Sequence, residues 1–385
     1  MNYTFPIKGL STQSIAINAH AALPAIRTAP TSRTFYAAAH VVADPYVSSA
    51  GEDSVSLDWD ATMRFRHHLW SHGLGVAEAM DTAQRGMGMT WEKVKELLSR
   101  TMTEARSVGG CVVSGVATDQ LPPGTHSLDT IVAAYLEQLE FTLDQGATPV
   151  IMCSRQLAAS ATSPDDYLRV YDTVLQASST PVVLHWLGSM FDPALHGYWG
   201  AKEYSDAKAT VIELMGRHTS RIDGIKMSLL KEEFEVDLRR QLPSTVKMYT
   251  GDDYNYVRLI QGDGERHSHA LLGAFAVVGA YAAHAARALD RSDVGEYQRI
   301  LGPTESLSRE VFKRPTYFYK TGVVWLAYLS GFQDHFVMVG GLQSGRSLRD
   351  LCELYILGNE IGLFPDPDLA HFRLLAHLRI AGVDA

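Results

Sequence analysis

Residues 181–186 read Pro-Val-Val-Leu-His-Trp, a helical pattern follows over 204–217, and residues 222–226 read Ile-Asp-Gly-Ile-Lys. Both short runs are apolar and rich in branched side chains, which is typical of buried strands. Two strands that are joined through a helix run parallel in their sheet, because the crossover carries the chain back to the edge where it started. This stretch therefore predicts a strand–helix–strand unit of a parallel sheet.

The same alternation continues on both sides of this unit. Six further apolar runs lie at 35–42, 75–79, 111–115, 149–153, 246–250 and 270–275. Helix signals separate them: Thr90 is a plausible N-cap, Gly146 suits a helix C-terminus, and Ser163-Pro164 opens another helix. Eight such units predict an α/β protein with a (β/α)8 TIM barrel. A doubly wound open sheet is the competing architecture, but no Gly-x-Gly-x-x-Gly motif follows an early strand.

We expect three regions along the chain. Residues 1–33 are polar and weakly patterned, which indicates an N-terminal lead-in, and residues 34–285 hold the barrel. Beyond about residue 276 the pattern is wholly helical, so residues 286–385 are predicted to form a C-terminal helical extension packed on the barrel. Within this extension, the apolar helix that begins at Lys320 is expected to serve as core or as a subunit contact. Trp325, Tyr328 and Phe332 recur at helical spacing and are candidate interface residues.

Composition narrows the class of protein. The 385 residues carry 34 Lys and Arg against 43 Asp and Glu, a net charge of −9, which argues against a nucleic-acid partner. Three cysteines, Cys111, Cys153 and Cys352, show no metal-ligand or disulfide spacing. The first residues lack a signal-peptide pattern, and the longest apolar run, 270–283, is shorter than the ~20 residues of a membrane helix. We expect a cytoplasmic protein with no membrane partner and no cofactor.

In a (β/α)8 barrel the catalytic side chains lie at the carboxyl ends of the strands and in the loops after them. This rule selects a short set of candidates: Asp44, Glu78, Asp81, Thr82, residues 115–119, Arg155, Gln156, His185, Lys226, Gly251, Asp252 and Asp253.

Lys226 is the most informative of these candidates, because it closes an apolar run and should point into the barrel mouth. Two interpretations stay open on position alone. The lysine can be the structural partner of a buried carboxylate. Alternatively, burial lowers its pKa, and the neutral amine attacks a substrate carbonyl to form an imine, an electron sink for making or breaking a carbon–carbon bond.

Two motifs resemble those of a known superfamily. The run Asp223-Gly-Ile-Lys-Met, followed by Thr250-Gly-Asp-Asp, is similar to dihydrodipicolinate synthase and N-acetylneuraminate lyase, which are class I Schiff-base aldolases on a (β/α)8 barrel with a C-terminal helical extension. The resemblance covers about residues 34–300. It implies that Lys226 is the imine-forming nucleophile and that the protein assembles as a homodimer or homotetramer.

The chain also departs from this superfamily. The Gly-Thr-Thr-Gly-Glu loop after the second strand, which holds a keto-acid carboxylate, is replaced by residues 78–85, and Met152-Cys-Ser-Arg stands where a proton-relaying tyrosine is expected. A divergent, uncharacterised branch is therefore indicated. Because the Asp81 carboxylate repels a keto-acid carboxylate but accepts hydrogen bonds from hydroxyl groups, the substrate is predicted to be a polyhydroxylated, sugar-derived keto compound rather than pyruvate.

The remaining assignments follow from position at the mouth. His185 is the candidate general acid or base, since its ordinary pKa lies near 6.5. Substrate binding is assigned to Asp81, Thr82, Gln156, Gly251 and Asp252. Each has a structural alternative: Asp81 can pair with Arg85, His185 can fill space beside Trp186, and the two aspartates after Gly251 can cap a turn.

Two other classes of function stay open. Glu78, Asp81, His185 and Asp252 can be combined into a divalent-metal site of a sugar isomerase or epimerase, although no metal is expected. His267 and His269 precede the last strand and should lie at the opposite face of the barrel. A ligand-binding protein that has lost catalysis is the third reading, against which stands the retention of Lys226.

Overall fold

The computed structural model describes residues 2–4, 14–16, 23–47 and 55–383. Eight parallel strands form a closed barrel in chain order, with the last strand pairing with the first. The strands are β3 (Phe35–Ala38), β4 (Gly75–Glu78), β5 (Val112–Val116), β6 (Thr148–Ile151), β7 (Val182–Leu187), β8 (Ile222–Ser228), β9 (Lys247–Thr250) and β10 (His269–Leu272). The predicted (β/α)8 barrel is confirmed.

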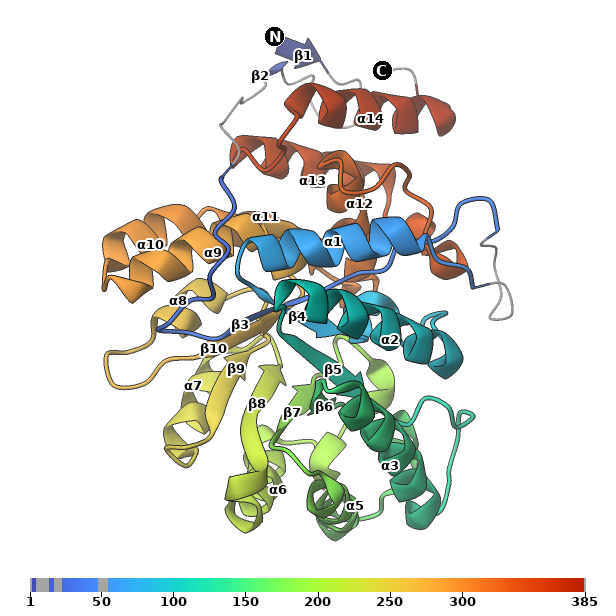
Figure 1. Cartoon of the computed structure of the whole chain (residues 1–385), viewed down its shortest axis with the longest axis vertical. Coiled ribbons are helices and arrows are strands. Elements are labelled where there is room, and N and C mark those ends of the chain that lie inside the picture. The colour runs from blue at the N-terminus through green and yellow to red at the C-terminus, as the bar shows by residue number, and fades with distance from the viewer. Residues whose placement is uncertain (1, 5–13, 17–22, 48–54, 384–385) are drawn as a thin grey trace.

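Helices follow every strand and form the outer layer (Figure 1). They are α1 (Trp59–Ser71), α2 (Trp91–Val108), α3 (Leu128–Gln145), α4 (Arg155–Ser160), α5 (Pro164–Ala177), α6 (Tyr204–Arg217), α7 (Glu232–Gln241), α8 (Tyr256–Gln261) and α9 (Phe275–Asp290). The predicted caps are present: the Thr90 hydroxyl accepts from the Lys93 amide, and Gly146 adopts the left-handed conformation at φ 83°.

Two strand predictions were too long by three residues or more. The apolar runs at 35–42 and 270–275 continue past the strands, because β3 ends at Ala38 and β10 at Leu272. Phe275 is already the first residue of α9. A continuous apolar run fits a buried strand and a buried helix equally well, so the pattern does not mark where one becomes the other.

The C-terminal extension consists of α10 (Val294–Leu301), α11 (Thr304–Val311), α12 (Tyr319–Leu329), α13 (Leu348–Glu360) and α14 (Pro367–Ile380), and it stacks over one side of the barrel (Figure 1). The predicted boundary at residue 285 falls inside α9. Trp325 is fully buried and its indole nitrogen donates to the Leu351 carbonyl oxygen at 2.9 Å. It is therefore a core residue, and its prediction as an interface residue was wrong.

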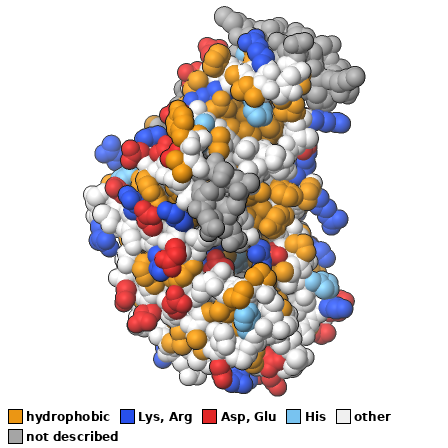
Figure 2. Space-filling model, turned by 90° about the vertical axis from the view of Figure 1, so that its right-hand side faces the viewer, with side chains coloured by type: hydrophobic (Ala, Val, Ile, Leu, Met, Phe, Trp, Pro, Cys, Tyr) orange, Lys and Arg blue, Asp and Glu red, His pale blue; other side chains and the backbone are white. Residues whose placement is uncertain are grey.

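The lead-in has more structure than its sequence pattern indicated. Strands β1 (Asn2–Thr4) and β2 (Ser14–Ala16) pair antiparallel, outside the barrel. Further on, the Asp290 carboxylate accepts from the backbone amides of Thr31 and Ser32, which fixes this segment to the end of α9. The surface mixes both signs of charge on the face drawn in Figure 2. No helix among the described residues is long and apolar enough to cross a membrane.

Candidate active site

Lys226 points into the barrel from β8. Side chains alternate along a strand, so Gly224, Lys226 and Ser228 share one face. A Cβ atom at Gly224 would lie 2.6 Å from the ring of Tyr249, which belongs to the apolar cluster inside the barrel. Lys226 therefore follows this cluster toward the carboxyl end of the strand, as the sequence predicts.

Gly251, directly after β9, makes room for the lysine. A Cβ atom there would lie 2.8 Å from Cε of Lys226 and 2.2 Å from the Ser228 hydroxyl oxygen. Both distances are shorter than side chains tolerate, so any larger residue displaces the lysine. Because Gly251 has no side chain, it leaves the space that the Lys226 side chain occupies.

The Lys226 amine is buried without a salt bridge. The residue is only 7% exposed, and no carboxylate of the described residues lies within 4.0 Å of its Nζ. Burial lowers the pKa of the amine, while the charges of Asp81 and Asp253 partly oppose this shift. A lysine in such surroundings is more readily neutral, and hence nucleophilic, than one at the surface.

The two aspartates after Gly251 face different ways. Asp253 lies near Lys226, and one carboxylate oxygen accepts from the Ala274 amide at 2.8 Å. Burial raises the pKa of Asp253 to about 7, against the lowering effect of the Lys226 charge. Asp252 instead accepts from the Tyr254 and Asn255 amides at 2.9 and 3.1 Å. The structure thus puts Asp253 beside the lysine and gives Asp252 the turn-capping contacts.

His185 lies on β7 in register with Lys226. It is fully buried, its Nε2 is 3.3 Å from the Ser228 hydroxyl oxygen, and its Nδ1 has no partner among the described residues. Burial, helped by the charge of Lys226, lowers the histidine pKa well below its ordinary value. The imidazole is therefore neutral at neutral pH and only a weak base, which suits it to a hydrogen bond with Ser228 rather than to proton transfer.

Asp81 and Thr82 occupy the short helix η2 (Asp81–Ala83) after β4. The Asp81 carboxylate forms no hydrogen bond or ion pair within the part of the chain that is described, and its charge acts on Lys226 and on a second lysine, Lys320. The Thr82 hydroxyl lies 2.8 Å from the hydroxyl of Tyr319, the first residue of α12.

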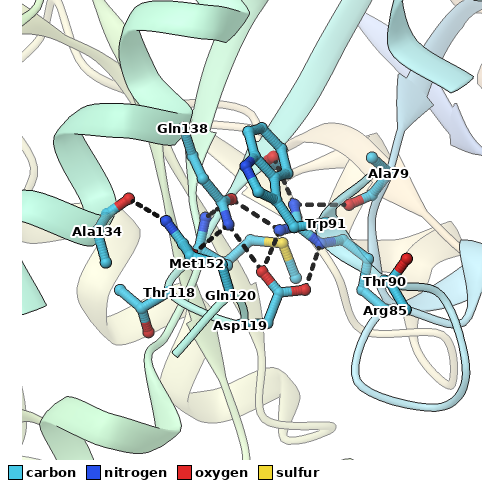
Figure 3. Close-up of polar contacts among 12 residues, drawn as sticks. Ala79, Arg85, Thr90, Trp91, Thr118, Asp119, Gln120, Ala134, Gln138 and Met152 are labelled. Carbon is cyan, nitrogen blue, oxygen red and sulfur yellow. Dashed lines mark hydrogen bonds and ion pairs between the residues drawn. The ribbon is translucent and has the colours of Figure 1, made fainter. Parts of the chain in front are cut away.

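Arg85 does not pair with Asp81, so that structural alternative was wrong. Its guanidinium binds Asp119 through both carboxylate oxygens and donates to the Gly115 carbonyl oxygen at 2.7 Å. Gln138 accepts from the same guanidinium at 2.7 Å and donates to Asp119 at 2.9 Å (Figure 3). This network ties together the loops after β4 and β5 and leaves the Asp81 carboxylate available.

Gln156 contacts the protein rather than the barrel mouth. Its carbonyl oxygen accepts from the Thr118 hydroxyl at 2.8 Å, and its amide nitrogen donates to the Leu121 and Pro122 carbonyl oxygens at 3.0 and 3.4 Å. The side chain fixes the loop after β5. Its assignment to substrate binding stays a prediction that these contacts do not favour.

The residues proposed as metal ligands do not come together. Glu78 pairs with Arg66 at 2.8 Å and accepts from the Thr101 hydroxyl at 2.6 Å, both from the helical layer. His269 accepts from the Thr34 amide at the start of β10, on the opposite face of the barrel, as expected. Across the described ranges, no three His, Cys, Asp or Glu side chains form a group that could hold a metal ion.

Two residues of the extension reach the mouth without having been predicted there. Tyr319 packs edge-on against Phe191 of the loop after β7 and stacks on Phe312. Its neighbour Lys320 is 3% exposed and lies within the electrostatic reach of Asp81 and Arg155. The only signal in the sequence is a single lysine at the head of an otherwise apolar helix.

The architecture and the buried strand lysine define the class of protein: a (β/α)8 barrel with the fold of the dihydrodipicolinate synthases. The YagE prophage protein of E. coli K12, in complex with pyruvate, superimposes with a TM-score of 0.67 at 13% identity, over 86% of this chain and 99% of that one. The chloride-inhibited dihydrodipicolinate synthase of Acinetobacter baumannii, complexed with pyruvate, gives 0.65 at 13% identity, over 87% and 100%. The enzyme from Aquifex aeolicus gives 0.64 at 11%, over 86% and 98%.

The particular family comes from a second comparison. A family model described as "Protein of unknown function (DUF993)" matches residues 4–383, and the chain belongs to this family. A search of the curated proteins found no match. The predicted resemblance to a divergent branch is thus confirmed at the level of the fold, and identities of 11% to 13% fit the replaced loops.

Proposed function

We propose that this protein is a lyase of the Schiff-base aldolase type that acts on a small, hydroxylated keto compound through an imine on Lys226. The carrying observation is the Lys226 amine, which is buried on a barrel strand, has no salt bridge in the described structure and has a lowered pKa. Two structural neighbours, the YagE protein and the Acinetobacter baumannii synthase, are complexes with pyruvate, a small carbonyl compound, which supports a carbonyl substrate here.

The chemistry begins with the neutral amine. Its lone pair attacks the carbonyl carbon and forms a C–N bond while the second bond of the C=O group breaks. The nitrogen loses one proton to a base and the oxygen takes one up, which gives a neutral carbinolamine. A second proton allows this oxygen to leave as water, which yields a protonated imine. A base then removes the proton of a hydroxyl two carbons away, and this oxygen forms a new C=O bond as the C–C bond breaks. The fragment that carries it leaves as an aldehyde or ketone, and the electron pair of the C–C bond moves into the imine as an enamine. Protonation at carbon and hydrolysis return the amine.

Two groups can move these protons, and a third orients a neighbouring hydroxyl. Asp253, with a pKa raised to about 7, gains and loses a proton near neutral pH beside the amine. Tyr319 places a hydroxyl near Asp81 and Asp253 and is bonded to Thr82. His185, held neutral, is proposed as an acceptor that orients Ser228. Asp253 and Tyr319 thus take the place of the tyrosine that is absent after β6.

Substrate hydroxyls are proposed to bind at Asp81. Its carboxylate is free of the Arg85 network and can accept two hydrogen bonds, and Thr82 lies next to it. Gly251 contributes by leaving space over Lys226. Asp252 and Gln156 then act on the loops that carry these groups rather than on the substrate.

The test is reduction with borohydride in the presence of a panel of keto acids and keto sugars, read by intact mass and peptide mapping. A reduced adduct on the peptide that contains Lys226 supports the proposal, and its mass identifies the carbonyl fragment. Lys226→Arg should abolish the adduct. Lys247→Arg is the matched control, because Lys247 lies at the far end of the neighbouring strand and pairs with Asp223 at 2.8 Å. An adduct that survives in Lys226→Arg overturns the assignment.

A further inference from the structure

Lys320 is a second buried lysine at the barrel mouth, and it comes from outside the barrel. It lies in the first turn of α12, next to Tyr319, and is 3% exposed. Its electrostatic neighbours come from the segments that follow three barrel strands: Asp81 after β4, Arg155 after β6 and Asp192 after β7. The extension therefore delivers an ammonium group to the surroundings of Asp81, whose charge also acts on Lys226.

The contacts of this ammonium group leave its charge unbalanced. Nζ donates to the Tyr317 carbonyl oxygen at 3.4 Å and lies over the rings of Tyr319 and Tyr317 at 4.6 and 5.2 Å. No carboxylate of the described residues comes within ion-pair distance of it. Asp192 is already paired with Arg155, from Oδ2 to Nε at 2.5 Å.

Another lysine of the extension, Lys313, has the counter-ions that Lys320 lacks in the described structure. Lys313 pairs with two carboxylates, those of Glu310 and Asp350. Burying an ammonium group without a counter-ion is unfavourable, and such a group is retained in a fold where a function requires it. Burial lowers the pKa of Lys320 to about 8, which an anion bound to it would raise again.

We propose that Lys320 binds an anionic group of the substrate, a carboxylate or a phosphate, while the carbonyl carbon of the same molecule reacts with Lys226. This inference rests on the proposed function and narrows its substrate class to hydroxylated keto compounds that carry a negative charge. Once the imine is protonated, Asp81 faces that new cation as well as the substrate hydroxyls. The charge of Lys320 is then left for the anion.

The test compares two probes of nearly equal size. Hydroxypyruvate and dihydroxyacetone differ in that a carboxylate replaces a hydroxymethyl group beside the carbonyl. The measured quantity is the concentration of each probe that gives half-maximal borohydride trapping on Lys226. We expect the ratio between the probes to favour hydroxypyruvate by about tenfold more in the native protein than in Lys320→Met. Dihydroxyacetone phosphate forms a third arm, which distinguishes a phosphate from a carboxylate.

Two further variants keep the outcome interpretable. Lys320→Arg retains the charge and should retain most of the preference, whereas a merely structural role for the lysine would not track charge. Lys313→Met removes one positive charge from the same extension and should leave the ratio unchanged. If both probes trap on Lys226 and Lys320→Met leaves their ratio unchanged, the anion site is wrong while the aldolase proposal stands. If no keto compound traps in the native protein, both proposals fall.

Discussion

The two lysines at the barrel mouth show how differently a strand and an added helix carry a functional group. Lys226 lies on β8, which is hydrogen-bonded to β7 and β9 on either side. Lys320 lies on α12, which is held by packing of Tyr319 against Phe191 and Phe312. Both amines are buried, and burial lowers the pKa of both.

The difference indicates a division of labour between the two regions. A strand with neighbours on both sides has a fixed register, so a side chain on it is positioned within a fraction of an ångström. A helix of an extension can shift or be replaced without breaking the barrel. We therefore expect the bond-forming amine to reside on the barrel and the groups that select the substrate to reside on the extension.

The largest effect is expected for Lys226→Met, which removes the nucleophile. Borohydride trapping should fall by more than about 1,000-fold, because nothing else in the mouth forms the same imine in the same geometry. The free energy of unfolding should stay equal or rise, since a buried amine is replaced by an apolar side chain of similar length. Urea titration measures the free energy of unfolding and borohydride trapping measures imine formation, so both effects can be determined separately on the same sample. A variant that loses both activity and fold would contradict the view that Lys226 is kept for chemistry.

Tyr319→Phe tests whether the extension also supplies a proton. Loss of the hydroxyl removes its contact with Thr82 and should slow imine formation by about 100-fold, the scale of a lost acid–base group. Tyr281→Phe is the matched control, since its hydroxyl donates to the Ile361 carbonyl oxygen at 2.6 Å, away from the mouth. Stopped-flow or quenched trapping measures the rate. Equal rates in the two variants would remove Tyr319 from the mechanism.

Gly251→Ala tests the space over Lys226. The added methyl group meets the Ser228 hydroxyl and Cε of Lys226, so we expect about tenfold weaker trapping and a loss of roughly 1–3 kcal/mol in unfolding free energy. Gly216→Ala on α6 is the control, because its Cβ would meet nothing within 4 Å. That variant should be neutral or more stable by up to about 1 kcal/mol. Unchanged trapping in Gly251→Ala would show that the lysine does not depend on this glycine.

The smallest effect concerns stability and lies outside the mouth. Glu235 on α7 is buried, accepts from the Ser268 hydroxyl at 2.6 Å, and has a pKa raised by burial to about 8 from an ordinary 4.5. The folded state therefore holds a proton that the unfolded chain releases above about pH 4.5. The protonated Glu235 carboxyl group therefore adds to the free energy of unfolding. This added stability is fully present below pH 4.5 and is lost as the pH rises through about 8.

Glu235→Gln should consequently flatten the decline of unfolding free energy between pH 5 and pH 8, measured by urea titration at several pH values. Glu213→Gln, on the exposed face of α6, should leave the native slope in place. A native protein whose stability is flat over this range would mean that Glu235 is ionised in the fold.

Much of the barrel follows from short-range patterns. Branched apolar runs between capped helices locate all eight strands, because a strand buried on both faces must be apolar and a parallel crossover needs a helix. The ends of β3 and β10 were misplaced, since an apolar run does not reveal where extended backbone becomes helical. The hairpin of β1 and β2 was missed, because its short strands lack an apolar alternation.

In the candidate site, too, the positions on strands were predictable from the sequence and the contacts between loops were not. Lys226, Gly251 and His185 were predicted from their positions at strand ends, where direction follows from alternation along the strand. Whether Asp252 or Asp253 faces the lysine depends on the turn after β9, which no pattern encodes. That Arg85 takes Asp119 rather than Asp81 depends on how two loops meet.

By itself, the sequence determined the barrel, the strand that carries Lys226 and the inward direction of that side chain, because these depend on residues close together in the chain. Only the tertiary structure decided that Thr82 meets Tyr319 and that Lys320 shares the electrostatic surroundings of Asp81. Those residues are separated by most of the chain, and the packing of α12 on the barrel brings them together. A helix pattern shows that α12 is apolar but not which face of the barrel it covers.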